Sequence, residues 1–245
     1  MANWSDPRAT SVPSTRAVRE AAFDAGLRSY MLSVYNYMMS GVLLTGIVAL
    51  LFSSGGAGSP AARLFMQGGI LPLVVMLAPL GVVMWLSFGI NRMAEGTARA
   101  LFWVYSVLMG LSLSTILLVY TGGSVAQAFF ATAAAFAGLS LWGYTTQKDL
   151  SGFGTFLIMG VVGLVVAMLI NMFMRSTMLD LAISAIGVLL FAGLTAYDTQ
   201  RIKSGYFAVA GTATIGKSAI MGALTLYLDF INLFMFLLRF MGQRR

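Results

Sequence analysis

The stretch LYLDFINLFMFLLRF, residues 226–240, has the composition of a membrane helix except for one aspartate, Asp229. An acid at the centre of a membrane span costs roughly 2.5 to 3.5 kcal/mol on insertion scales. Such residues usually face the interior of a helix bundle or an aqueous cavity, and they are usually paired. We therefore predict that Asp229 has a partner and a function. The alternative is a protonated aspartate that only hydrogen-bonds a neighbouring helix.

The composition of the whole chain indicates an integral membrane protein. The 245 residues are 59% hydrophobic and 9% charged, with a mean hydropathy of +0.87, whereas soluble domains carry about 25% charged residues. The chain contains no His and no Cys. Their absence excludes disulfides and the usual zinc ligands, and it argues against rhomboid-type or papain-type catalysis. Any pH response must come from carboxylates.

Seven stretches are apolar and long enough to cross about 30 Å of hydrocarbon as helices. Short connections with turn residues separate them, so the predicted fold class is an all-α membrane protein with one seven-helix domain at 30–245. A polar tail at 1–29 precedes it and is expected in the cytoplasm. The seven candidate spans are 30–52, 70–90, 99–120, 125–145, 153–174, 180–202 and 219–241.

The positions of Lys and Arg predict the orientation, because short basic loops stay in the cytoplasm. Apart from the C-terminal tail, only Arg63 and Arg175 fall on the side opposite the N-terminus. The net charge of +7 forms no patch with interleaved aromatics, so a nucleic-acid partner is not expected. We predict a cytoplasmic N-terminus. The basic residues on its side are Arg8, Arg16, Arg19, Arg28, Arg92, Arg99, Lys148, Arg201, Lys203 and Lys217.

The C-terminus conflicts with this rule. Seven full crossings place Arg239, Arg244 and Arg245 outside. A re-entrant last segment explains both anomalies, the position of these arginines and the acid at position 229. Such a segment enters from the cytoplasm, stays in the bundle centre and returns. Polar segments that do not span are tolerated where protein surrounds them. A re-entrant last helix is therefore one expectation.

Asp198, near the cytoplasmic end of the sixth segment, is the partner that the sequence offers to Asp229; an interfacial position is its alternative explanation. Two carboxylates brought together cannot both ionise cheaply, so we expect them to share a proton and to act as a pH sensor and gate. Arg92 is the candidate latch, released when protonation removes its attraction to the pair. Deprotonated, the pair would bind Ca²⁺ weakly, helped by Asn232, backbone carbonyls or water. Weak binding suits a permeation path.

Two motifs together closely resemble the paired signature of the Bax inhibitor family, the transmembrane Bax-inhibitor-motif (TMBIM) proteins, in its bacterial branch. They are AGLTAYDTQRIK at 192–203 and ALTLYLDFINLFMFLLRFMG at 223–242. The resemblance implies six helices around a central seventh, in a bacterial cytoplasmic membrane. It also implies a pH-sensitive calcium leak governed by two aspartates, which match Asp198 and Asp229. Tyr197, in the first motif, is a supporting candidate beside Asn232.

Other functions stay open from the sequence. The chain is not expected to be an enzyme or to hold a cofactor other than weakly bound Ca²⁺. The AYD motif also resembles the first active-site motif of presenilin-like aspartyl proteases, but LYL stands here where those enzymes have a Gly-rich motif before the second aspartate. A regulatory protein that binds a membrane protein partner, such as a protease, without transport is one alternative. A cation/proton exchanger is another.

Overall fold

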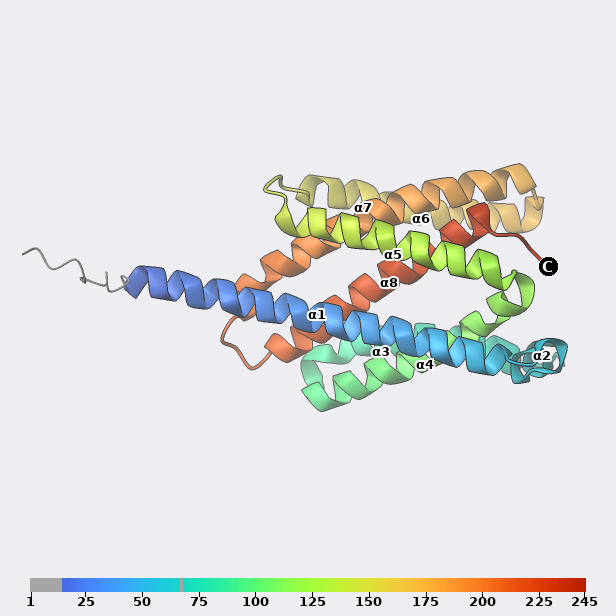
Figure 1. The fold of residues 1–245 in the computed structure, drawn as a ribbon, viewed down its shortest axis with the longest axis horizontal. Coiled ribbons are helices and arrows are strands. Elements are labelled where there is room, and N and C mark those ends of the chain that lie inside the picture. The colour runs from blue at the N-terminus through green and yellow to red at the C-terminus, as the bar shows by residue number, and fades with distance from the viewer. Residues whose placement is uncertain (1–14, 67) are drawn as a thin grey trace, which may run out of the picture.

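The computed structural model describes residues 15–66 and 68–245, and this part of the chain is all-α (Figure 1). Seven of its helices are long and apolar enough to cross a membrane, which confirms the predicted seven-span fold. The short helix α2 and two 3₁₀ turns, Gly56–Gly58 and Ile90–Arg92, lie in connections and were not predicted. The α-helices are α1 (Thr15–Ser53), α2 (Pro60–Met66), α3 (Leu71–Gly89), α4 (Glu95–Val119), α5 (Gly122–Thr145), α6 (Ser151–Met174), α7 (Thr177–Val209) and α8 (Ile215–Met241).

Helix α8 is the central helix of the bundle. In its most apolar window 67% of the residues are buried, against at most 33% in any other span. Figure 1 shows α8 running between α1, α3 and α4 on one side and α5, α6 and α7 on the other. A helix that is apolar on every side is stable only when other helices or lipid cover it. The expected arrangement of six helices around the last one is confirmed.

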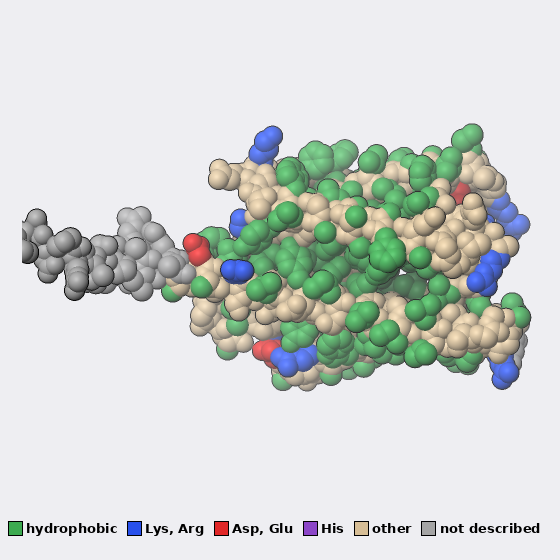
Figure 2. All heavy atoms as spheres, viewed as in Figure 1, with side chains coloured by type: hydrophobic (Ala, Val, Ile, Leu, Met, Phe, Trp, Pro, Cys, Tyr) green, Lys and Arg blue, Asp and Glu red, His purple; other side chains and the backbone are tan. Residues whose placement is uncertain are grey.

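The outer surface of the bundle is apolar. Figure 2 shows hydrophobic side chains over the middle of the molecule, and Lys and Arg side chains gathered at its two ends. Leu43, Phe88, Phe130 and Leu189 are each exposed by 66% or more of their surface. An apolar surface of this extent is stable against hydrocarbon and unstable in water.

The re-entrant alternative for the last helix is wrong. Helix α8 is continuous from Ile215 to Met241, and at 1.5 Å per residue it is about 40 Å long, enough to cross the hydrocarbon core. Its C-terminal end is fixed beside the α4–α5 connection. The Thr121 N–H donates to the Gln243 carbonyl at 3.0 Å, and the Arg245 N–H donates to the Val119 carbonyl at 2.9 Å.

The C-terminal arginines misled the sequence prediction because they have local partners. The Arg244 guanidinium lies over the Tyr120 ring, 5.9 Å from its centroid, where cation–π attraction stabilises it. The charge rule is a bias summed over all short loops, and the ten basic residues predicted on the cytoplasmic side outweigh these three. The chain can therefore end on the side opposite its N-terminus without reversing the predicted orientation.

Helices α1 and α7 both extend beyond their predicted ends, 30–52 and 180–202, at the same end of the bundle. Residues 15–29 of the predicted tail are helical, while residues 1–14 lie outside the described part. Phe23 holds the two extensions together, with its ring centroid 5.1 Å from that of Tyr206 and 5.0 Å from that of Phe207. Such contacts are worth about 0.5 to 1.5 kcal/mol beyond area burial. Hydropathy alone could not place these helix ends.

We expect Lys148 and Gln243 to lie on opposite sides of the membrane. Both side chains are exposed, and the natural chain lacks cysteine, so single substitutions Lys148→Cys and Gln243→Cys give unambiguous labels. A membrane-impermeant maleimide should label Gln243→Cys in intact spheroplasts and Lys148→Cys only after permeabilisation. Labelling of both positions from the same side would contradict the full crossing of α8.

Candidate functional site

Asp198 on α7 and Asp229 on α8 meet inside the bundle. Their carboxyl groups are neighbours, close enough to share a hydrogen bond once one of them carries a proton, and the two residues are only 7% and 4% exposed. If both groups are ionised they can only accept, and the buried Oδ2 atom of Asp229 then has no donor. A proton shared between the carboxyls, or a cation beside them, supplies what this oxygen lacks.

Both aspartates lie well inside their helices. From the helical rise of 1.5 Å per residue, Asp229 is about 20 Å from either end of α8, and Asp198 is about 16 Å from the C-terminal end of α7. The Asp198 side chain keeps 10% of its surface exposed, beside Arg201. Asp198 is buried between helices rather than on the outer surface of the bundle, and its depth relative to the membrane interface stays a prediction.

Arg201 is the cation that approaches the pair. Its Nη1 atom lies 4.0 Å from Oδ1 of Asp198, one turn earlier on the same helix, and its side chain is 69% exposed. The contact links the buried pair to the end of the bundle predicted to face the cytoplasm. An arginine three residues after an acid on a helix lies on the same face, so the spacing could have identified it, although we assigned Arg201 only to the topology signal.

The structure does not bring the other predicted site residues to the pair. Arg92 is exposed in the α3–α4 connection; among the described residues it forms no ion pair, and its latch role stays a prediction. Tyr197 packs against Gly154 of α6, where a Cβ atom would overlap its ring. The Nδ2 group of Asn232 donates to the Leu228 carbonyl of its own helix at 2.9 Å.

A chain of hydroxyl groups ties α7 to its outer neighbours next to Asp198. Thr199 lies 3.0 Å from the Ser140 hydroxyl on α5, and Ser140 lies 2.6 Å from the Tyr35 hydroxyl on α1. Hydroxyl pairs between membrane helices contribute about 0.6 kcal/mol on average, and up to about 1.7 kcal/mol. They fix the rotation of α7, and therefore the direction of Asp198.

A second polar contact fixes α8 two residues before Asp229. The Thr45 hydroxyl on α1 donates to the Ser106 carbonyl at 2.8 Å, so the Tyr227 hydroxyl, 2.7 Å away, donates to Thr45. Each helix of the pair is thus anchored to a different set of neighbours. Across the described residues, the Asp198–Asp229 contact is the sole polar side-chain link between α7 and α8.

Between Asp229 and the C-terminal end of α8, the side chains around the helix are apolar. The rings of Phe191 and Phe236 stack with centroids 5.6 Å apart, and Leu233 is fully buried one helical turn after Asp229. Gly187 makes room for Phe236, because a Cβ there would lie 2.6 Å from the ring. We call Phe191, Leu233 and Phe236 the apolar plug. They close the bundle between the pair and the C-terminal end of α8.

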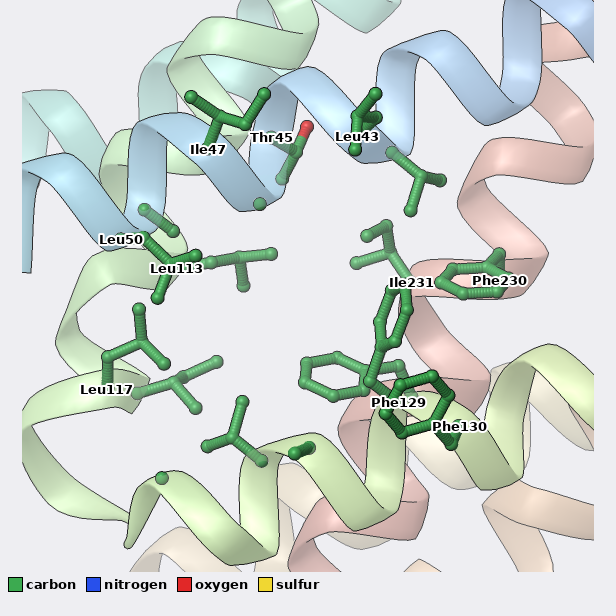
Figure 3. A pocket seen from close by; sticks show the side chains of 18 residues that line it. Leu43, Thr45, Ile47, Leu50, Leu113, Leu117, Phe129, Phe130, Phe230 and Ile231 are labelled. Atoms are coloured by element: carbon green, nitrogen blue, oxygen red, sulfur yellow. The ribbon is translucent and has the colours of Figure 1, made fainter.

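A groove opens sideways toward the lipid beside α8 (Figure 3). Its volume is about 390 Å³, and its walls come from α1, α4 and α5, with Phe230, Ile231 and Phe234 of α8 at its base. Thr45 is the one residue with a polar side chain in its lining, and its hydroxyl is already bonded. A hydrated ion gains no ligands from such a surface, so the groove is not a route to the pair.

Comparison with known proteins agrees with the two aspartate motifs. A family model described as "Inhibitor of apoptosis-promoting Bax1" matches residues 27–245. The chain belongs to the Bax inhibitor family. Two relatives are similar over nearly their whole length. RP147 of Rickettsia prowazekii is 47% identical over 94% of this chain and 96% of the relative, and inner membrane protein YbhL of Escherichia coli is 43% identical over 98% of each.

A third relative, from Caulobacter vibrioides, is 48% identical over 97% of this chain and 96% of its own length. These matches confirm the Bax inhibitor resemblance and its bacterial branch. Together with the seven spans, the similarity to YbhL supports a multi-pass inner membrane protein. The cytoplasmic N-terminus stays a prediction.

We expect Gly143→Ala to destabilise this Bax inhibitor family protein by about 1 to 3 kcal/mol, as overpacking does. A Cβ at position 143 of α5 would overlap the Ala196 carbonyl of α7, two residues before Asp198. Thermal unfolding in detergent should show the loss. Gly138→Ala on the same helix is the matched control, because nothing lies within 4 Å of its Cβ position. Equal melting temperatures for the two variants would contradict this packing.

Proposed function

We propose that this protein is a pH-sensitive calcium leak channel of the bacterial cytoplasmic membrane, gated by the Asp198–Asp229 pair. The observation that carries the proposal is the buried carboxyl contact, which is the sole polar side-chain link between α7 and α8 among the described residues. The Bax inhibitor family membership is consistent with it. Its other partners are protons and the lipid bilayer.

The number of protons on the pair determines both its charge and its bond. With one proton, the carboxyls share a hydrogen bond and carry one negative charge. Without a proton, the two like charges repel each other in a medium that screens them poorly, which favours separation of the helices. With two protons, no charge is left to attract a cation. A change of pH therefore acts directly on the α7–α8 interface.

The pair has the chemistry of a weak calcium site. Ca²⁺ takes six to eight oxygen ligands, and two carboxylates supply only part of that set. Within the described residues, no cluster of three or more acidic, His or Cys side chains is present. Water and backbone carbonyls would have to complete the shell, so a bound ion can leave again.

Two features support a closed conformation in which the pair communicates with one side. Arg201 connects Asp198 to the exposed surface at the predicted cytoplasmic end. The apolar plug lies between Asp229 and the opposite end. Opening then requires α8 to move against α7 far enough to part Phe191 from Phe236. The two helices whose contact responds to protons are also those that carry the plug.

We expect Asp198→Asn and Asp229→Asn to flatten the dependence of calcium flux on pH in proteoliposomes between about pH 6 and 8, because Asn cannot share a titrating proton. Asp149→Asn is the control. Hydrogen bonds from the Ser151 N–H and hydroxyl lower the pKa of Asp149 below its usual value, so this exposed acid stays ionised near neutrality, and its loss should leave the curve unchanged.

The same measurement separates the alternatives. Flux that is tightly coupled to counter-movement of protons indicates an exchanger. A purified protein without calcium flux that retains a stable membrane partner indicates a regulatory protein. If both aspartate variants kept the wild-type dependence of calcium flux on pH, this result would falsify the proposal that the pair is the gate.

We expect Phe236→Ala to raise basal calcium flux several-fold, because the substitution opens the plug where the ring of Phe236 stacks on Phe191. The core of the protein loses about 3 to 5 kcal/mol in such a change, so gel filtration should first establish that the variant is folded. Phe240→Ala is the matched control, since Phe240 is 49% exposed on the same helix. Unaltered flux in a folded Phe236→Ala protein would show that the plug is not the barrier.

A further inference from the structure

A polar cavity lies at the end of the bundle where α8 finishes. Its volume is about 500 Å³, and the end of α6, the beginning of α7 and the end of α8 line it. Three arginines from two places in the chain contribute to the lining: Arg175 after α6, and Arg239 and Arg244 at the end of α8. Asp180 is the one acid in it. The lining therefore carries an excess of two positive charges.

Among the described residues, the three arginines have no counter-ions. Across residues 15–66 and 68–245, none of them has a carboxylate oxygen within the 4.0 Å of an ion pair. All three side chains are exposed. Like charges that share a cavity repel one another, so an anion between them stabilises the arrangement.

The backbone holds two of these arginines in place. Arg175 ends α6 in the left-handed conformation, with φ of 50°, and its N–H donates to the Asn171 carbonyl at 2.7 Å. Glycine is the usual residue at such a helix end, and a side chain there is strained. Arg244 is held by the backbone bridge to Tyr120 and by the ring of that tyrosine. The Arg244 guanidinium is thus placed by a contact within the protein, and the backbone of Arg175 is fixed at the edge of the cavity.

The cavity opens at the level of the lipid headgroups. Next to its arginines in the sequence stand large apolar side chains that are exposed and belong in hydrocarbon: Phe173 at 81%, Met174 at 64%, Met178 at 77% and Phe240 at 49%. Figure 2 shows Lys and Arg side chains at this end of the molecule, beyond the apolar band. A ligand that comes from the membrane reaches the cavity without leaving the bilayer surface.

We propose that this cavity binds the phosphate group of a membrane phospholipid in the leaflet opposite the N-terminus. Guanidinium groups donate paired hydrogen bonds to phosphate oxygens, and arginine is the residue best suited to such bidentate binding. The first turn of α7, which begins at Thr177 in the same cavity, adds its partial positive charge. The site is separate from the aspartate pair and does not depend on the proposed ion leak.

The test is native mass spectrometry of the full-length protein in detergent, titrated with phosphatidylglycerol. We expect Arg175→Gln, Arg239→Gln and Arg244→Gln each to raise the Kd about tenfold, since a hydrogen bond to a charged group contributes about 1.5 to 3 kcal/mol. Asp180→Asn should lower the Kd. Arg63→Gln is the matched control, because Arg63 lies in the last turn of α2 at the same end of the bundle and does not line the cavity.

Arg175→Gly separates lipid binding from folding. Glycine suits the left-handed backbone at position 175, so this variant should melt at or above the wild-type temperature and still lose affinity for the lipid. A parallel titration with inorganic phosphate identifies the source of the anion. Saturation by phosphate alone, without retention of phosphatidylglycerol, would overturn the lipid assignment. Lipid binding that falls equally in Arg63→Gln, or in none of the cavity variants, would overturn the site.

Discussion

The contact between two carboxyl groups in an apolar interior is the constraint on which the rest of this structure depends. Neither Asp198 nor Asp229 can stay ionised cheaply at this depth without a counter-charge. A shared proton converts the repulsion into a bond, but that bond exists only while the proton is present. Among the described residues, no other side-chain hydrogen bond or ion pair joins α7 to α8. The stability of one helix interface, at the centre of the bundle, therefore depends on proton concentration.

The surrounding helices determine what this dependence can do. Thr199, Ser140 and Tyr35 anchor α7 to α5 and α1, while Tyr227 anchors α8 to α1 through Thr45. The two aspartates thus belong to parts of the bundle that are fixed separately and touch at one polar point. On one side of that point Arg201 leads to the surface, and on the other lie the stacked rings of the plug, Phe191 and Phe236. Repulsion between the two carboxylates therefore acts on an interface that has a path to the surface on one side and apolar rings on the other.

Composition and the cost of a buried charge account for the features that could be predicted from the sequence. The seven spans and the central position of α8 depend on hydrophobicity, which each segment carries in its own residues. The pairing of Asp198 with Asp229 was accessible because few other acids lie at depth. The hydroxyl chain from Thr199 to Tyr35 was not, because Ser, Thr and Tyr are common in membrane helices and their spacing does not identify partners. The end of α7 at Val209 depends on contacts with Phe23 that no local pattern contains.

The error over the last helix is informative, because it came from treating arginine only as a topology signal. Arg239 and Arg244 lie at the end of the bundle predicted to be disfavoured for positive charge, where an arginine needs a local reason to remain. The ring of Tyr120 stabilises the charge of Arg244. A phosphate bound in the shared cavity would stabilise the charges of both Arg239 and Arg244. These contacts also hold the C-terminal end of α8, whereas Tyr30 holds its first turn through Ser218. A helix held at both ends cannot slide along its axis. When charge builds up at Asp229, near its middle, the displacement open to α8 is lateral, away from α7 and from the ring of Phe191.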